Sequence, residues 1–148
     1  AEALKEAQRL GYAEADPTGD VEAWDPTAKI VILANVLMEG RIKVSEVPRE
    51  GITKITQADV DAARRDGKRI KLVAKAFREG NEVKAQVFPE HVAATDMLAH
   101  VSGVLNGITV STDVQPDVTV IGPGAGGDSA GYALLSDMLA INRDLGTR

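Results

Sequence analysis

The pattern of apolar positions predicts one buried helix in the first third of the chain. Residues Thr27–Met38 read TAKIVILANVLM, which is apolar on nearly every face of a helix, so we expect this helix to be buried rather than amphipathic. It should begin at Asp25-Pro26, because aspartate is a favourable N-cap and proline suits the first helical position. Glu39-Gly40 should end it.

Alternating apolar residues predict a β-hairpin in the middle of the chain. Arg69–Phe77 and Glu82–Phe88 alternate nearly regularly and flank the turn residues Glu79-Gly80-Asn81. Upstream, the Thr56-x2-Asp59 pattern predicts a capped helix over Gln57–Asp66. The other expected elements are a helix already under way at the first residues, short extended runs within Arg41–Ile55, sheet segments at Leu98–Asn106, Gly107–Val114 and Asp117–Ile121, and a closing helix over Asp128–Leu145.

The order of these elements indicates the fold class. Strand segments follow one another instead of alternating strictly with helices, which favours antiparallel pairing. We therefore predict an α+β fold with a mixed, largely antiparallel sheet and helices on one face. The length of 148 residues is enough for one domain with an apolar core.

Ionisable residues crowd the entrance of the predicted buried helix. Lys29 lies in its first turn, where desolvation and the positive end of the helix dipole both disfavour an ammonium ion. Asp25 lies one helical turn earlier and can share its face. The loop just upstream adds three more carboxylates, which are Glu14, Asp16 and Asp20.

Such a cluster suits the chemistry of a small polar substrate. Carboxylates can hold an ammonium group while the lysine exchanges a proton with a reacting oxygen. A purely structural explanation stays open at this point: a helix with an Asp25–Lys29 ion pair at its mouth, since structural ion-pair networks also surround titrating groups.

Composition narrows the function classes. The net charge is −5, without a block of lysine or arginine, which argues against nucleic-acid binding. The longest apolar run, Ile30–Met38, is too short to span a bilayer, so no membrane is implied. His91 and His100 have no ligand partners at metal-binding spacing, and we expect no metal site. The chain has no cysteine, which disfavours dehydrogenases with a thiol nucleophile and favours plain hydride transfer between aldehyde and alcohol.

Two motifs carry a family resemblance. Residues Ala7–Lys29 contain the spacing A-x3-G-Y-A-x2-D-P-x2-D-V-x3-D-x3-K, which resembles the signature of homoserine dehydrogenases. Val118–Gly127 read VTVIGPGAGG and are similar to the family's GPGAG loop. One position departs, because Ala23 stands where the family usually has glycine. If that glycine serves a positive-φ turn, Ala23 strains the turn slightly.

The resemblance implies a function and a set of roles. The family interconverts L-aspartate 4-semialdehyde and L-homoserine with NAD(P), on the route to threonine, methionine and isoleucine. It implies that Lys29 is the proton donor or acceptor and that Asp25 orients it. Glu14 would bind the amino end of the substrate, Asp20 would complete the polar wall, and Tyr12 would line the pocket.

The glycine-rich loop has more than one interpretation. Gly122–Gly127 satisfy G-x-G-x-x-G between a strand and a helix, as in a Rossmann fingerprint, but only 21 residues follow, too few for the rest of a βαβ unit. A turn needed only for packing is a further alternative. The resemblance implies that the loop lines the cofactor side of the cleft, with the expected contact residues Gly122, Gly124, Ala125 and Gly126.

The resemblance also implies that the chain is part of a larger enzyme. The family's dinucleotide-binding domain, which supplies most of the NAD(P) contacts and sets the NAD or NADP preference, precedes this region and is absent here. We expect residues 1–148 to be the catalytic and dimerisation domain of a cytoplasmic homodimer, inactive in isolation. The alternative is a non-catalytic dimerisation or amino-acid-binding module.

Overall fold

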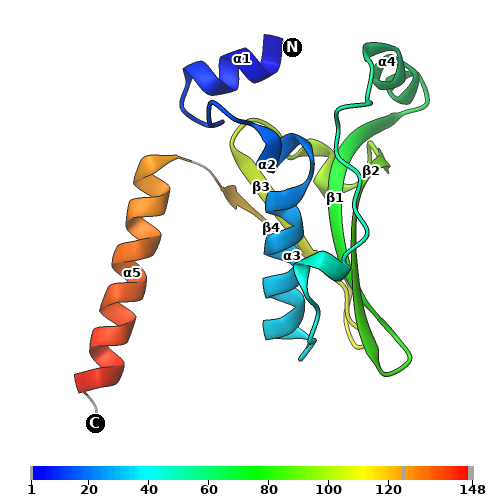
Figure 1. The fold of residues 1–148 in the computed structure, drawn as a ribbon. Coiled ribbons are helices and arrows are strands. Elements are labelled where there is room, and N and C mark those ends of the chain that lie inside the picture. The colour runs from blue at the N-terminus through cyan, green and yellow to red at the C-terminus, as the bar shows by residue number, and fades with distance from the viewer. Residues whose placement is uncertain (1, 125, 147–148) are drawn as a thin grey trace. The chain divides into compact units, whose positions relative to one another are not determined.

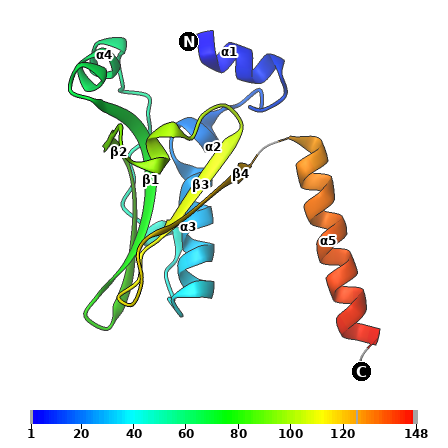
Figure 2. The ribbon, with the colours of Figure 1, turned by 180° about the vertical axis from the view of Figure 1, so that it is seen from behind.

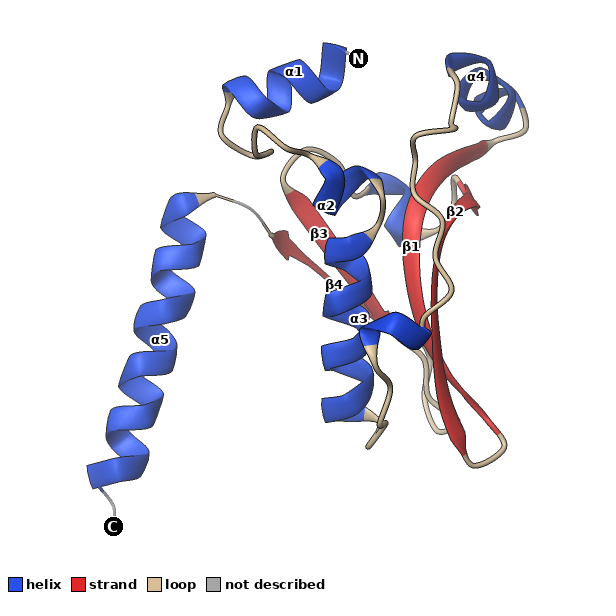
Figure 3. Ribbon diagram, viewed as in Figure 1, coloured by secondary structure: helices blue, strands red, loops and turns tan. Residues whose placement is uncertain are grey.

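The chain forms two compact units, which are described separately. The computed structural model describes residues 2–124 and 126–146 (Figure 1). One unit comprises Ala13–Ala99, and the other comprises Ala1–Tyr12 with His100–Arg148. Helices and strands both contribute, and the strands pair antiparallel in two sheets, β1 with β2 and β3 with β4, which confirms the α+β class (Figure 3).

The first unit is built on a long hairpin. Strands β1 (Lys68–Glu79) and β2 (Glu82–Ala93) pair antiparallel along their whole length, from Lys68 opposite Ala93 to Glu79 opposite Glu82. The turn therefore consists of Gly80 and Asn81, and Gly80 has a φ of 61°, as a tight two-residue hairpin turn requires. The predicted hairpin is confirmed, with strands longer than expected.

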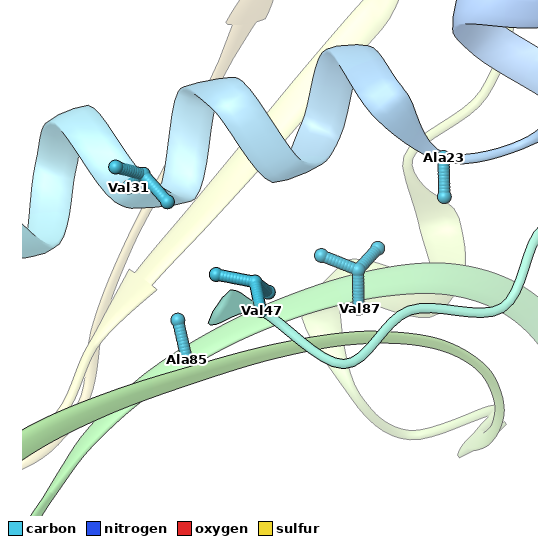
Figure 4. Packing of buried hydrophobic residues seen from close by; sticks show 5 residues of the cluster. All are labelled: Ala23, Val31, Val47, Ala85 and Val87. Atoms are coloured by element: carbon cyan, nitrogen blue, oxygen red, sulfur yellow. The ribbon is translucent and has the colours of Figure 1, made fainter. Parts of the chain in front are cut away.

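Helix α3 (Trp24–Leu37) packs on this hairpin (Figures 1 and 2). It buries one stripe, Thr27, Val31 and Ala34, at the spacing of one helix face. Figure 4 shows the apolar cluster between the helix and the hairpin, which contains Ala23, Val31, Val47, Ala85 and Val87.

The prediction of a helix buried on all sides was wrong. Ile32, Val36 and Leu37 are 61%, 72% and 67% exposed, on the faces of α3 away from the buried stripe. Within this unit α3 contacts mainly the β1–β2 hairpin, on one side of the helix, so one buried stripe is enough to cover the sheet. The apolar side chains on the other faces of α3 are therefore not buried within this unit.

An asparagine side chain fixes the chain just beyond α3. The Asn35 amide donates to the Ile42 carbonyl (3.0 Å) and accepts from the Ile42 amide (2.9 Å), so it copies the pairing of a β-bridge. The backbone of Gly40 comes so close that an added Cβ would lie 2.9 Å from the Asn35 side-chain oxygen. Asn35, the polar residue in this apolar helix, therefore fixes the position of the chain around Ile42, just after the helix.

Beyond Ile42, the chain is largely irregular as far as the next α-helix. A short 3-10 turn, η1 (Val44–Glu46), is followed by a single parallel bridge between Arg49 and Val87. Helix α4 (Gln57–Arg65) then begins at the predicted capping box, in which Thr56 and Asp59 exchange side-chain to backbone hydrogen bonds. The hydroxyl and amide of Thr56 lower the pKa of the Asp59 carboxyl.

The second unit is built from both ends of the chain. Helix α1 (Glu2–Arg9) opens it, and strands β3 (Leu105–Val110) and β4 (Val118–Pro123) pair antiparallel. Helix α5 (Gly127–Gly146) confirms the expected closing helix and leaves a row of apolar side chains exposed, namely Leu134, Met138, Ile141 and Leu145.

The predicted sheet segment Leu98–Asn106 was wrong. Most of it forms the 3-10 turn η2 (Met97–His100) and a loop with the left-handed Gly103, and only its last residues enter β3. Short apolar runs do not distinguish a turn from a strand by periodicity alone.

None of the helices in the described ranges is both long and apolar enough to cross a membrane.

We expect Asn35→Ala to lower the free energy of unfolding by about 1–3 kcal/mol, because it leaves two part-buried backbone groups of Ile42 without their partner. Urea denaturation followed by circular dichroism measures this change. The control is Asn142→Ala on the exposed surface of α5, for which we expect a change within about 0.5 kcal/mol. Equal effects of the two substitutions would show that the Asn35 bridge contributes no stability.

Candidate active site

A left-handed residue precedes the helix that carries Lys29. Ala23 has a φ of 65° and a ψ of 23°, and its side chain is fully buried. Its carbonyl accepts two hydrogen bonds from Thr27, one from the amide (3.2 Å) and one from the hydroxyl (2.6 Å). Thr27 is itself fully buried, and its hydroxyl group is satisfied by this hydrogen bond to the Ala23 carbonyl. Thr27 thus ties the first turn of α3 to the carbonyl of the left-handed residue.

This turn sets the first residue of α3. The helix begins at Trp24, with Ala23 in the N-cap position and without a side-chain cap. The prediction that Asp25 is the N-cap was therefore wrong, and Asp25 and Pro26 lie inside the first turn. The Asp25 carboxylate still lies near the positive end of the helix dipole.

Asp25 and Lys29 form an ion pair at the entrance of α3. The Lys29 Nζ lies 2.6 Å from Asp25 Oδ2, at the (i, i+4) spacing predicted from the sequence. The expected desolvation of Lys29 was wrong, because its side chain is 57% exposed and that of Asp25 is 45% exposed. An exposed pair of this kind contributes only about 0–1 kcal/mol to stability. The pair is therefore accessible from solvent and is of little importance to the fold.

The other acidic residues lie along the chain before α3. Asp16 accepts from the amide (3.1 Å) and hydroxyl (2.5 Å) of Thr18, and both bonds lower the pKa of its carboxyl. Asp20 lies in the short helix α2 (Thr18–Val21), and the side chains of Glu14 and Asp20 are exposed. The sequence predicted that these carboxylates gather around Lys29, and the contact described between them is the ion pair of Lys29 with Asp25. Within residues 2–124 and 126–146, no group of three or more acidic or histidine side chains could hold a metal ion.

The residue before Asp25 in the sequence is the aromatic Trp24. The Arg49 guanidinium stacks on the Trp24 ring, 3.2 Å from the ring centroid, which is a cation–π contact. Both residues line a surface hollow of about 550 Å³, to which Glu22, Glu50 and Lys54 also contribute. Trp24 is 45% exposed and packs against an arginine, a contact that the sequence did not suggest.

Tyr12 and the glycine loop belong to the second unit. Tyr12 is 46% exposed, and its amide donates to Ala7 (2.9 Å) in the turn that ends α1. Gly122 is in β4, and the Gly124 amide donates to Val104 (2.8 Å). Ala125 lies outside the described residues. The expected contacts of these residues with cofactor or substrate stay predictions.

Different structural features explain the individual glycines of this loop. A Cβ on Gly124 would meet the Asn106 side chain, whose Cβ lies 3.0 Å away, and Gly126 has a φ of 116°. A Cβ on Gly122 or Gly127 would meet no atom within 4 Å. Packing within the chain therefore explains Gly124, and backbone conformation explains Gly126, while Gly122 and Gly127 leave open space in front of the backbone.

Comparison with known proteins adds a decisive finding. The family model for homoserine dehydrogenase matches residues 1–139, nearly the whole chain. The chain belongs to the homoserine dehydrogenase family. It is 42% identical to an NAD(+)-dependent homoserine dehydrogenase of Pseudomonas canavaninivorans, of which it covers 41% while 97% of the chain is matched. It is 43% identical to homoserine dehydrogenase of Mycobacterium tuberculosis H37Rv, matching 100% of the chain and 35% of that protein.

A solved structure of the family has the same fold. The crystal structure of S. aureus homoserine dehydrogenase matches with a TM-score of 0.87 at 40% identity, over 95% of this chain and 36% of that one. The chain thus spans well under half the length of these homoserine dehydrogenases.

Sequence reasoning missed three residues near the entrance of α3, namely Thr27, Arg49 and Gly51. Thr27 could have been found, because a threonine four residues after a turn residue can bond back to its carbonyl. Arg49 contacts Trp24, and Gly51 lies against the backbone of Val21 and Glu22, but no local pattern connects their loop to the helix. Their contacts depend on tertiary structure.

We expect Ala23→Gly to change the free energy of unfolding by less than about 1 kcal/mol, because relief of the left-handed alanine offsets the loss of a buried methyl group. The matched control is Ala34→Gly, which removes an equally buried methyl from the helical interior of α3. There the glycine adds its helix penalty, for a total of about 2 kcal/mol. Urea denaturation compares the two variants. Equal destabilisation would show that Ala23 carries no strain.

Proposed function

We propose that the chain is the catalytic and substrate-binding part of an NAD(P)-dependent homoserine dehydrogenase that interconverts L-aspartate 4-semialdehyde and L-homoserine. The observation that supports this most directly is the exposed Asp25–Lys29 pair, at the 2.6 Å distance of a charge-assisted hydrogen bond. The pair lies at the end of the motif that resembles the family signature. The hypothesis of a non-catalytic module is not favoured, because the relatives reported above are named as dehydrogenases.

Lys29 is the proposed proton-transfer residue. In the oxidation, the hydroxyl proton of homoserine passes to the Lys29 amine as the carbonyl forms, and in the reduction the ammonium returns that proton to the oxygen. The nicotinamide, when bound, accepts or supplies the hydride. Asp25 keeps the Lys29 side chain in one orientation through their ion pair. A lysine that is exposed in the free chain can reach a substrate without a rearrangement of the core.

The proposed substrate contacts come from residues of the signature motif that ends at this pair. Glu14 binds the substrate ammonium, Asp20 contributes a second carboxylate to the polar wall, and Tyr12 presents its ring and hydroxyl. The side chains of all three residues are exposed, so they are accessible to a ligand.

The glycine loop is the proposed contact with the cofactor. Gly122, Gly124 and Gly126 have no side chains to keep a flat ring or a phosphate away from the backbone, and the α5 amides follow directly. The open space in front of Gly122 fits such an approach. Ala125 completes the motif. We propose that most of the NAD(P) contacts come from a dinucleotide-binding domain in the longer protein, and that the exposed apolar row of α5 packs toward it.

Further proposals concern the setting of the enzyme. We propose a cytoplasmic homodimer that serves the synthesis of threonine, methionine and isoleucine. The proposal of an enzyme larger than this chain agrees with the length of the relatives, of which the chain covers 35–41%.

We expect Lys29→Ala in the full-length enzyme to lower kcat for homoserine oxidation by about 10²–10⁴-fold, the usual contribution of a general acid or base. Cofactor affinity should stay nearly unchanged, because the amine acts where the proton moves. The control is Lys54→Ala, which removes a lysine from another exposed (i, i+4) ion pair, with Glu50. Steady-state kinetics with NAD+ and NADP+ measure both. A Lys29→Ala enzyme with most of its turnover would exclude Lys29 from the mechanism.

We expect Glu14→Gln to raise the KM for homoserine by about 10–100-fold, the loss expected for one hydrogen bond to a charged group. The kcat should change little, because the carboxylate holds the ammonium equally in the ground and transition states. Glu22→Gln, a second exposed carboxylate of the same segment, should leave the KM unchanged. A collapsed kcat with an unchanged KM would make Glu14 a participant in the chemistry.

A further inference from the structure

One extended segment joins the sheet to the turn before α3. Residues Val47–Ile52, here called the bridging segment, are held to β2 by two backbone bonds, from Val87 to the Pro48 carbonyl (3.0 Å) and from Glu50 to the Val87 carbonyl (2.9 Å). At its other end, the Ile52 amide donates to the Val21 carbonyl (2.8 Å). The segment therefore connects a fully buried strand residue to the residues that precede α3.

Gly51 makes the closest contact between the bridging segment and the turn. It is buried, and its backbone is not left-handed, so glycine is not required there for conformation. It is required for space, because an added Cβ would lie 2.7 Å from the Glu22 Cα, 3.0 Å from the Val21 carbonyl carbon and closer still to the Val21 oxygen. These are backbone atoms, so a side chain could be accommodated only by moving the turn.

Arg49 adds a second contact from the same segment. Its guanidinium covers the ring of Trp24, the first residue of α3, at 3.2 Å from the ring centroid. The bridging segment thus touches Val21, Glu22 and Trp24, on both sides of the left-handed Ala23. The next residue along the chain is Asp25.

We infer that Gly51 and Arg49 are positioning residues for the Asp25–Lys29 pair: their contacts with the turn fix where α3 begins, and therefore where the lysine amine lies. This inference rests on the proposed function, in which that amine transfers the proton. Neither residue needs to touch the substrate. A displacement of about 1 Å at a reacting group can cost about 100-fold in rate, so a shift of the turn has a large effect on turnover.

The first test compares two alanine substitutions at opposite ends of α3. Gly51→Ala pushes on the backbone before the helix, whereas Gly40→Ala pushes on Asn35 and Ala34 at its other end. In the full-length enzyme we expect Gly51→Ala to lower kcat by about 100-fold and Gly40→Ala to lower it by less than about threefold. Melting temperatures of both variants show whether loss of folding accounts for the difference. Equal effects on kcat at equal stability would overturn the inference.

The second test uses Arg49, whose replacement introduces no clash. We expect Arg49→Ala to lower kcat by about tenfold, with an unchanged KM for the cofactor, and Arg49→Lys to restore part of the loss by keeping a cation over the ring. Trp24 is the only tryptophan of the 148 residues, so the emission of this 148-residue chain, measured with and without Arg49→Ala, reports directly on the stack. An altered Trp24 emission with unchanged kcat in Arg49→Ala would overturn the role of Arg49.

A third measurement separates this inference from the proposed function. In ¹H–¹⁵N spectra of the 148-residue chain, Gly51→Ala should shift the amide resonances of residues 21–25 and 27–29, and Gly40→Ala should leave them in place. An unshifted first turn in Gly51→Ala would overturn the inference. A wild-type enzyme that does not oxidise homoserine would overturn the proposed function alone, and the spectra would still decide whether Gly51 sets the start of α3.

Discussion

The arrangement of the candidate site depends on the two hydrogen bonds that Thr27 makes to the carbonyl of Ala23. They anchor the carbonyl of an alanine whose left-handed conformation costs L-residues about 1–2 kcal/mol. Both bonds lie inside the apolar core, where a lost hydrogen bond has no replacement from water. The left-handed turn directs the chain from α2 into α3. The direction in which Lys29 leaves the helix follows from that turn.

The turn at Ala23 has one role in the apolar core and another at the candidate site. The methyl group of Ala23 contributes to the cluster with Val87, whereas its backbone conformation serves the entrance of α3. Glycine, which stands here in the signature that the sequence resembles, would satisfy the conformation and leave the space beside Val87 unfilled. Alanine satisfies the packing and accepts the strain. The site residues themselves are exposed, so their replacement should affect activity more than folding.

Local patterns predicted the parts of the structure that depend on neighbouring residues. The Gly80-Asn81 hairpin, the capping box at Thr56 and the (i, i+4) spacing of Asp25 and Lys29 all follow from short-range chemistry, and all are present. The burial of α3 was overestimated because composition cannot show which faces have a partner. The contacts of Arg49 and Gly51 were missed because they join segments about 25–30 residues apart, for which a single sequence contains no periodic signal.

The parallel bridge between Arg49 and Val87 also bears on the order of folding. The hairpin can form from contacts between near neighbours around its two-residue turn, on the timescale of microseconds. The bridge must close a loop that contains α4 and all of β1, which carries a larger entropic cost. We therefore expect the hairpin to form first and the entrance of α3 to become ordered late. In the native state, the same region should open before the hairpin does in hydrogen exchange.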